Sequence, residues 1–159
     1  MRKPGLTEWA VIGGLIASVG FVVSLLFVAN SVNRNIDVQQ ASTENLIFEL
    51  HAQLANQVLA DPSFARILFK MRSFRPELDQ IEAIRWEKYQ MGLLDIWSMA
   101  YRRHQVQLLS DEQWKAWDEY FTVLFTDGGE KLSRLRWEQL QSAYDDGFWT
   151  HVEQAVFKY

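Results

Sequence analysis

The feature that most restricts this chain is a run of 21 residues without a charged side chain, from Trp9 to Ala29. A helix rises about 1.5 Å per residue and the hydrocarbon core of a bilayer is about 30 Å thick, so the run is long enough to cross a membrane. Trp9 stands where an aromatic residue would mark the boundary between membrane and water. We therefore predict a transmembrane helix over residues 9–29, preceded by a short N-terminus of residues 1–8.

A cleavable signal peptide is the alternative interpretation of this run. Ala29 and Ser31 are small residues that could flank a cut after Ser31. The apolar centre of a signal peptide, however, is about 7 to 15 residues long, and this run is longer. Its length favours an anchor that stays in the protein.

Positive charge near the run predicts how the protein is oriented. Arg2 and Lys3 precede the apolar segment, whereas only Arg34 follows it closely. Because positively charged flanks tend to stay in the cytoplasm, the N-terminus is predicted to be cytoplasmic. In a bacterium, the remainder of the chain would then lie in the periplasm, anchored to the inner membrane.

Small residues recur in the apolar run at alternating steps of three and four. This spacing places them on one face of a helix; they are Ala10, Gly13, Ala17, Gly20 and Ser24. Transmembrane helices associate through close backbone approach and hydrogen bonds between helices, both of which small residues permit. The strip predicts docking against another transmembrane helix, from a second copy or from a different membrane protein. The alternative is composition alone, since glycine and serine are common in such helices.

The composition of the chain predicts a folded domain and excludes several kinds of partner and site. The chain is 48% hydrophobic and 14% aromatic, which is too rich for a disordered protein. After Ala29 there are 14 basic and 19 acidic residues, so nucleic acid is not an expected partner. Cysteine is absent, which excludes disulfides, thiol nucleophiles and zinc–thiolate sites.

The pattern beyond residue 30 is helical, with no alternating β-branched run bounded by turn residues. A first helix is predicted from about Asp37, as N-cap, to Leu59, and residues 30–45 form a stalk and the start of this helix. Further signals predict a short helix opened by Asp61-Pro62, the longest helix from Pro76 to about Gln107, a helix opened by the capping box Ser110-Asp-Glu-Gln113, a helix from Glu130 to about Ala143 after the Asp127-Gly-Gly129 break, and a last helix after Asp145-Asp-Gly147. The predicted class is all-α, with a compact bundle of five or six helices over residues 46–159.

Several of these local patterns together resemble a group of bacterial single-pass helical membrane proteins of unknown function. They are Leu59-Ala-Asp-Pro62, Asp95-Ile-Trp-Ser-Met-Ala-Tyr-Arg-Arg-His-Gln105, Leu108-Leu-Ser-Asp-Glu-Gln-Trp114, and Gly128-Gly129 ahead of Trp137. The resemblance covers about residues 46–157 and implies the same architecture with an N-terminal anchor. It implies no activity. One departure is Asp95, where the resemblance implies a glutamate.

Motifs that carry chemistry are missing from the sequence. The positions three residues before His51, His104 and His151 are aromatic, so the Glu-x-x-His pairs of a di-iron site are absent. No Cys-x-x-Cys-His, nucleophile elbow, phosphate loop or dinucleotide fingerprint is present. We therefore expect a protein that is not an enzyme, with no cofactor and no metal, whose histidines lie at the surface or cap helices.

Two kinds of side chain remain as candidates for a role. Asp95 interrupts the apolar run Met91–Trp97, and a structural ion pair with Arg66, Arg85, Arg102 or Arg136 is the favoured interpretation. The alternatives are a catalytic acid and a carboxylate that is simply exposed. Tryptophan is abundant beyond the anchor. Core packing is its default role, with one or two side chains reaching a partner surface; the candidates are Trp86, Trp97, Trp114, Trp117, Trp137 and Trp149.

These observations favour a membrane-anchored accessory or structural subunit that docks its span and its helical body onto a membrane protein complex. The alternative is an extracytoplasmic binding or sensory module whose helices enclose a small apolar ligand. A large enclosed pocket would favour the second hypothesis, and a solid core would favour the first.

Overall fold

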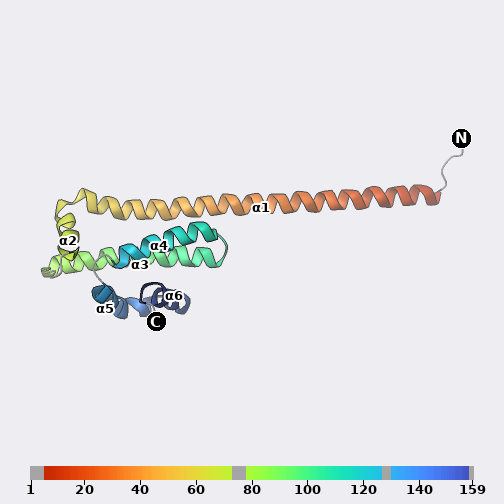
Figure 1. The fold of residues 1–159 in the computed structure, drawn as a ribbon. Coiled ribbons are helices and arrows are strands. Elements are labelled where there is room, and N and C mark those ends of the chain that lie inside the picture. Colours follow the sequence, from red (N-terminus) through yellow and green to blue (C-terminus); the bar gives the residue numbers. More distant parts are fainter. Residues whose placement is uncertain (1–5, 73–77, 127–129, 158–159) are drawn as a thin grey trace. The chain divides into compact units, whose positions relative to one another are not determined.

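The computed structural model describes residues 6–72, 78–126 and 130–157. Throughout these ranges the chain is helical and contains no strand, which confirms the all-α class. Figure 1 shows the helices in chain order. They are α1 (Leu6–Ala60), α2 (Pro62–Arg72), α3 (Gln80–Gln105), α4 (Asp111–Thr126), α5 (Glu130–Leu140), the short 3₁₀ helix η1 (Gln141–Ala143) and α6 (Asp146–Val156).

The first helix differs from its prediction. The sequence indicated a new helix at Asp37, but α1 continues without a break from Leu6 to Ala60 and is the longest helix described. The polar residues 30–45 contain neither glycine nor proline, the two residues that most disfavour a helix interior. Asp37 is therefore an interior residue of α1 and not an N-cap.

Most other helix starts follow the local signals in the sequence. Pro62 opens α2, and the Asp61 carboxylate accepts a hydrogen bond from the Ser63 backbone amide at 2.9 Å. Ser110 and Gln113 form the predicted reciprocal capping box ahead of α4. Asp145 caps α6 by accepting a hydrogen bond from the Phe148 amide at 2.9 Å.

The predicted start of α3 at Pro76 is wrong. Its N-cap is Asp79, which forms a capping box with Glu82, so the helix begins at Gln80 instead of at Pro76. Pro76 lies outside the described residues, as does the predicted break at Asp127-Gly-Gly129.

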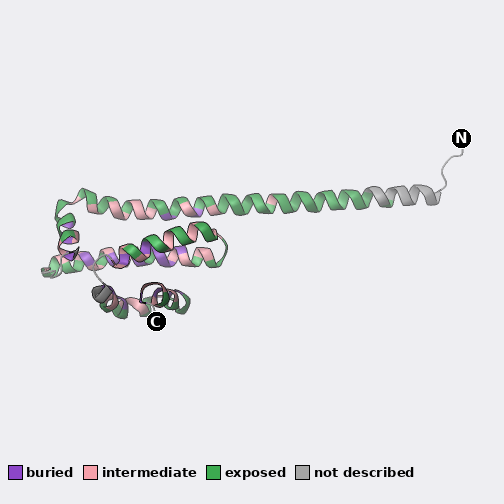
Figure 2. Cartoon of the chain, in the orientation of Figure 1, coloured by how far each residue is buried: buried purple, intermediate pink, exposed green. Residues whose placement is uncertain are grey.

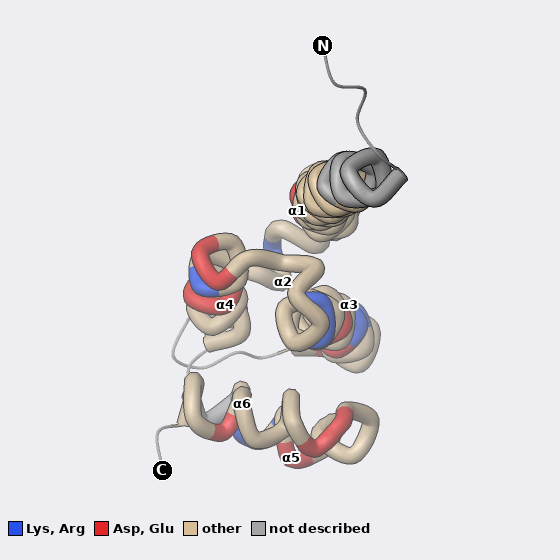
Figure 3. Tube along the Cα trace, turned by 90° about the vertical axis from the view of Figure 1, so that its right-hand side faces the viewer, with Lys and Arg blue, Asp and Glu red and all other residues tan. Residues whose placement is uncertain are grey.

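The chain divides into two units, residues 1–39 and residues 40–159. The second unit includes the last third of α1, so the described helices do not form a bundle that is clearly separate from this helix. Within the unit, α3 packs chiefly against α4 and also contacts α2 and α6, while α4 contacts α5 and α6. Figure 3 shows acidic and basic residues interspersed along these helices.

Two apolar clusters form the core of the second unit. The smaller cluster joins α2 to the start of α3 through Phe64, Ile67, Met71 and Trp86. The larger cluster brings together side chains from α1, α3, α4, α5 and α6; its fully buried members are Ile47, Leu94, Trp97, Ala100, Leu109, Phe121, Phe125, Trp137, Phe148 and Val152.

In the first unit, none of the residues whose burial is described is buried. Where burial is described, this part of α1 is exposed except at Ser31, which is of intermediate burial (Figure 2). Between Val19 and Val28, eight large apolar side chains are each more than half exposed. Among the described residues, α1 contains the one stretch long and apolar enough to cross a membrane, judged by length and composition.

Candidate functional site

The predicted docking strip on α1 is open where the structure describes it. Ala17 and Ser24 are exposed, and a Cβ atom built on Gly20 would have no neighbour within 4 Å. The surroundings of Ala10 and Gly13 lie outside the described residues. Docking of this strip therefore stays a prediction.

The tryptophans divide between the core and its edge. Trp86, Trp97 and Trp137 are buried, whereas Trp114 and Trp117 are partly buried and pack against the larger cluster. Trp149 is 39% exposed, and its indole N–H donates a hydrogen bond to the Gln141 side chain. Trp149 is thus the tryptophan of this set with the most surface left for a partner.

One partly buried carboxylate at the edge of the core connects three helices. A single oxygen of Asp118 on α4 accepts the indole N–H of Trp97 from α3 at 2.7 Å and lies 2.6 Å from Nε2 of His151 on α6. Trp97 is 1% exposed, so its N–H group has no access to water that could replace this bond. Asp118 thereby satisfies a buried donor and ties α3 and α6 to α4.

The three histidines pack on aromatic rings, which differs from the expected surface or capping role. His104 stacks on Trp114 and pairs with Asp111, which belongs to the first turn of α4. His51 on α1 contacts the hydroxyl of Tyr120 at 2.9 Å, and burial lowers the pKa of its imidazole. Within the described ranges, no group of three or more histidine and acidic side chains is placed to hold a metal ion.

The ion pair favoured for Asp95 is wrong, and the alternative of simple exposure is confirmed. Asp95 is exposed and accepts a hydrogen bond from the Tyr144 hydroxyl at 3.0 Å. Burial of Tyr144, reinforced by this carboxylate, raises the pKa of the phenol. Of the arginines named as partners, Arg85 pairs with Asp61 and Arg136 with Glu87, while Arg102 lines the same surface hollow as Asp95. In the described part of the chain, no arginine is within ion-pair distance of Asp95.

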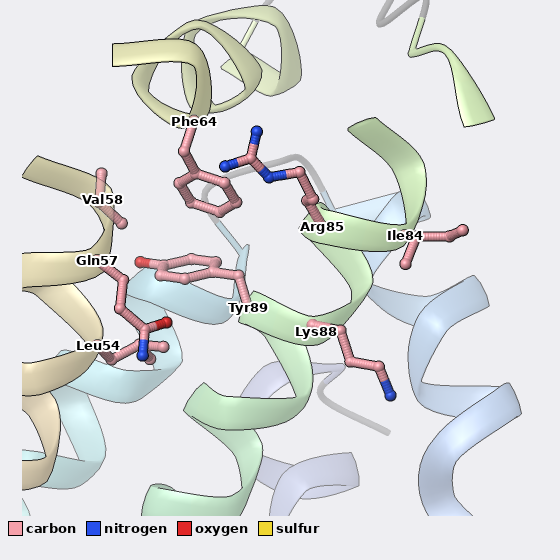
Figure 4. Close-up of a pocket in the computed structure, with 8 residues that line it drawn as sticks. All are labelled: Leu54, Gln57, Val58, Phe64, Ile84, Arg85, Lys88 and Tyr89. Atoms are coloured by element: carbon pink, nitrogen blue, oxygen red, sulfur yellow. The ribbon is translucent and has the colours of Figure 1, made fainter. Parts of the chain in front are cut away.

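A second surface hollow lies between the end of α1, α2 and the first half of α3 (Figure 4). It has a volume of about 230 Å³ and is open to solvent. We call it the α1–α3 hollow; its lining residues are Leu54, Gln57, Val58, Phe64, Ile84, Arg85, Lys88 and Tyr89. The lining contains two cations and no carboxylate.

Close packing and an ion pair fix the shape of this hollow. Gly92 lets α3 approach α1, since a Cβ atom there would stand 3.2 Å from the Leu54 side chain. The guanidinium of Arg85 bonds to Asp61 and to the hydroxyl of Ser63, and lies 5.6 Å from the centre of the Phe64 ring. Hydrogen bonds from Ser63 and Arg85 lower the pKa of Asp61 to about 2.

Comparisons of the chain with known proteins do not assign it to a family. No family model, curated protein or solved structure matches the chain. The resemblance to bacterial single-pass helical membrane proteins stays a prediction for this reason.

No motif in the sequence predicted the bonds of Asp118 to Trp97 and His151, or the α1–α3 hollow. Asp118 and His151 are 33 positions apart, and Asp61 and Arg85 are 24 apart, so both pairs depend on how separate helices pack. Only the capping signal at Asp61-Pro62 indicated that Asp61 has a local partner.

Replacing Asp118 with alanine should destabilise the protein by roughly 1–3 kcal/mol, because the buried N–H of Trp97 loses its acceptor. Glu119→Ala is the matched control, since Glu119 is the exposed neighbour on the same helix, and its effect should stay within about 0.5 kcal/mol. Chemical denaturation of both variants gives the comparison. Equal effects of the two substitutions would contradict a structural role for Asp118.

The depressed pKa of Asp61 predicts a loss of stability in acid. The folded state holds this pKa at about 2 against an ordinary value of 3.8, so the stabilisation is complete above pH 3.8 and is lost as the pH falls toward 2. Thermal unfolding of the parent protein and of Asp61→Asn should therefore differ at pH 6 and converge near pH 2. A difference in melting temperature that is the same at both pH values would show that the charge of Asp61 is not the cause.

Proposed function

We propose that this chain is a non-catalytic single-pass membrane protein that acts as an accessory or structural subunit of a membrane protein complex. The observation that carries the proposal is the exposed apolar surface of α1 between Val19 and Val28. In water this surface would be unfavourable by about 25 cal/mol per Å² of apolar area, whereas lipid accepts it at no such cost. The α-helix also satisfies its own backbone hydrogen bonds, which a membrane span requires.

In this proposal, the partner helix packs against the strip of small residues on α1. Gly20 has open space where a side chain would be, and Ala17 and Ser24 are exposed on the same face. A neighbouring transmembrane helix can approach such a face closely, and Ser24 can offer it a hydrogen bond. The opposite face carries bulky residues suited to lipid, such as Val19, Val22 and Leu26.

The packing of residues 40–159 favours binding of a partner protein at the surface over binding of a ligand in an enclosed cavity. The larger core cluster is filled with aromatic and aliphatic side chains, and both hollows described above are open to solvent. A sensory module that encloses an apolar ligand is the alternative function. In the proposed arrangement the N-terminus is cytoplasmic and residues 40–159 lie in the periplasm of a bacterium, because Arg2 and Lys3 outweigh Arg34.

The docking face can be tested by crosslinking within membranes, because the chain has no cysteine of its own. A photoreactive group attached through Ser24→Cys should crosslink to a protein partner. Adding Gly20→Ile should lower the yield by about tenfold, since the side chain holds the neighbouring backbone away. Val22→Ile on the opposite face is the matched control and should leave the yield unchanged. Crosslinks to lipid alone, or equal yields in both variants, would contradict the docking proposal.

The orientation can be tested with single cysteines and a maleimide that does not cross membranes. In spheroplasts, a cysteine introduced as Ser42→Cys, at an exposed position of α1, should react without permeabilisation. A cysteine introduced as Thr7→Cys should react only after the membrane is opened. The reverse pattern would place the body of the protein in the cytoplasm.

A further inference from the structure

The α1–α3 hollow combines an aromatic, apolar wall with uncompensated positive charge. Figure 4 shows Phe64 and Tyr89 between α1 and α3, with Leu54 and Gln57 across from Tyr89. The two rings lie 5.4 Å apart between centroids at an angle of 59°. Val58 and Ile84 complete the apolar part of the lining, and Ile84 is 52% exposed.

The charges around the hollow are unbalanced. Three nearby carboxylates already have cationic partners: Asp61 pairs with Arg85, Glu82 with Lys70 and Glu87 with Arg136. Lys88 lines the hollow and is exposed, and no carboxylate lies within ion-pair distance of it in the described ranges. With Arg85 balanced by Asp61, the hollow has a net charge of one positive unit, provided by Lys88.

We propose that the α1–α3 hollow binds a small aromatic monocarboxylate. The aromatic ring of the ligand lies against Phe64, Tyr89 and Val58, because aromatic rings pack well in offset or edge-to-face arrangements. Its carboxylate is paired with the ammonium group of Lys88, whose four-carbon stem is flexible enough to turn toward the ligand. Arg85, held by Asp61 and Ser63, supports the wall beside Phe64 and is a positioning residue.

The size of the hollow sets the scale of the ligand and of its affinity. A volume of about 230 Å³ is below the range of about 300–1,000 Å³ that is usual for drug-sized ligands. A ligand that fills it is therefore small, and a dissociation constant on the order of 1 mM is expected. Neutralising the charge of Lys88 should weaken binding by about fivefold, as for an exposed ion pair.

The test uses the full chain in nanodiscs of phosphatidylcholine, with empty nanodiscs as the blank. 4-Phenylbutyrate is the anionic probe, and 4-phenylbutyramide is its uncharged counterpart of similar shape. In ligand-observed NMR titrations, the carboxylate should bind about fivefold more tightly than the amide. Lys88→Gln should abolish this preference, whereas Lys115→Gln, which changes an exposed lysine on α4, should leave it intact.

A second variant locates binding in the hollow itself. Gln57 is exposed and lines the hollow, so Gln57→Trp should fill the space and remove binding of both probes while the thermal unfolding temperature stays unchanged. Binding that survives Gln57→Trp, equal affinity for the acid and the amide, or no binding of the acid at 10 mM would each overturn the proposal. These outcomes are independent of whether the span docks against another helix.

Discussion

The exposed apolar surface of α1 between Val19 and Val28 is the constraint on which the proposed function of this protein depends. A soluble domain would cover such a surface, and in the first unit, residues 1–39, none of the residues whose burial is described is buried. A bilayer covers it without cost and favours a helix that satisfies its own backbone groups. In the proposed function, the small residues on one face of the same segment are where a neighbouring helix, instead of lipid, makes close contact.

The second unit is organised around α3, which contacts α2, α4 and α6. Its Trp97 packs on Phe121, Phe125 and Phe148, and its indole N–H bonds to Asp118. The fully buried side chains of this core come chiefly from α1, α3, α4, α5 and α6, whereas the α1–α3 hollow is open to solvent. The packing of Leu54 against Gly92 and the pairing of Arg85 with Asp61 shape this hollow at the edge of the core.

Local signals in the sequence predicted most helix starts, because a helix cap is formed by residues that are close together in the chain. Pro62, the capping box at Ser110 and the cap at Asp145 all begin helices where expected. Asp37 failed as a start signal because nothing in residues 30–36 ends the preceding helix. The partners of Asp95, Asp118 and Arg85 could not be predicted, since each is set by the packing of helices that are far apart in the sequence. Similarly, the histidines looked unremarkable in sequence because the rings that pack on them come from other helices.

The central claim is that the apolar segment stays in the mature protein and lies in the bilayer. It is tested most directly by extracting cell membranes with alkaline carbonate and measuring the intact mass of the protein in each fraction. The account predicts that the protein remains in the membrane pellet and that its mass includes residues 9–31. A shorter protein in the soluble fraction, with an N-terminus near Val32, would show that the segment is a cleaved signal and would contradict the account.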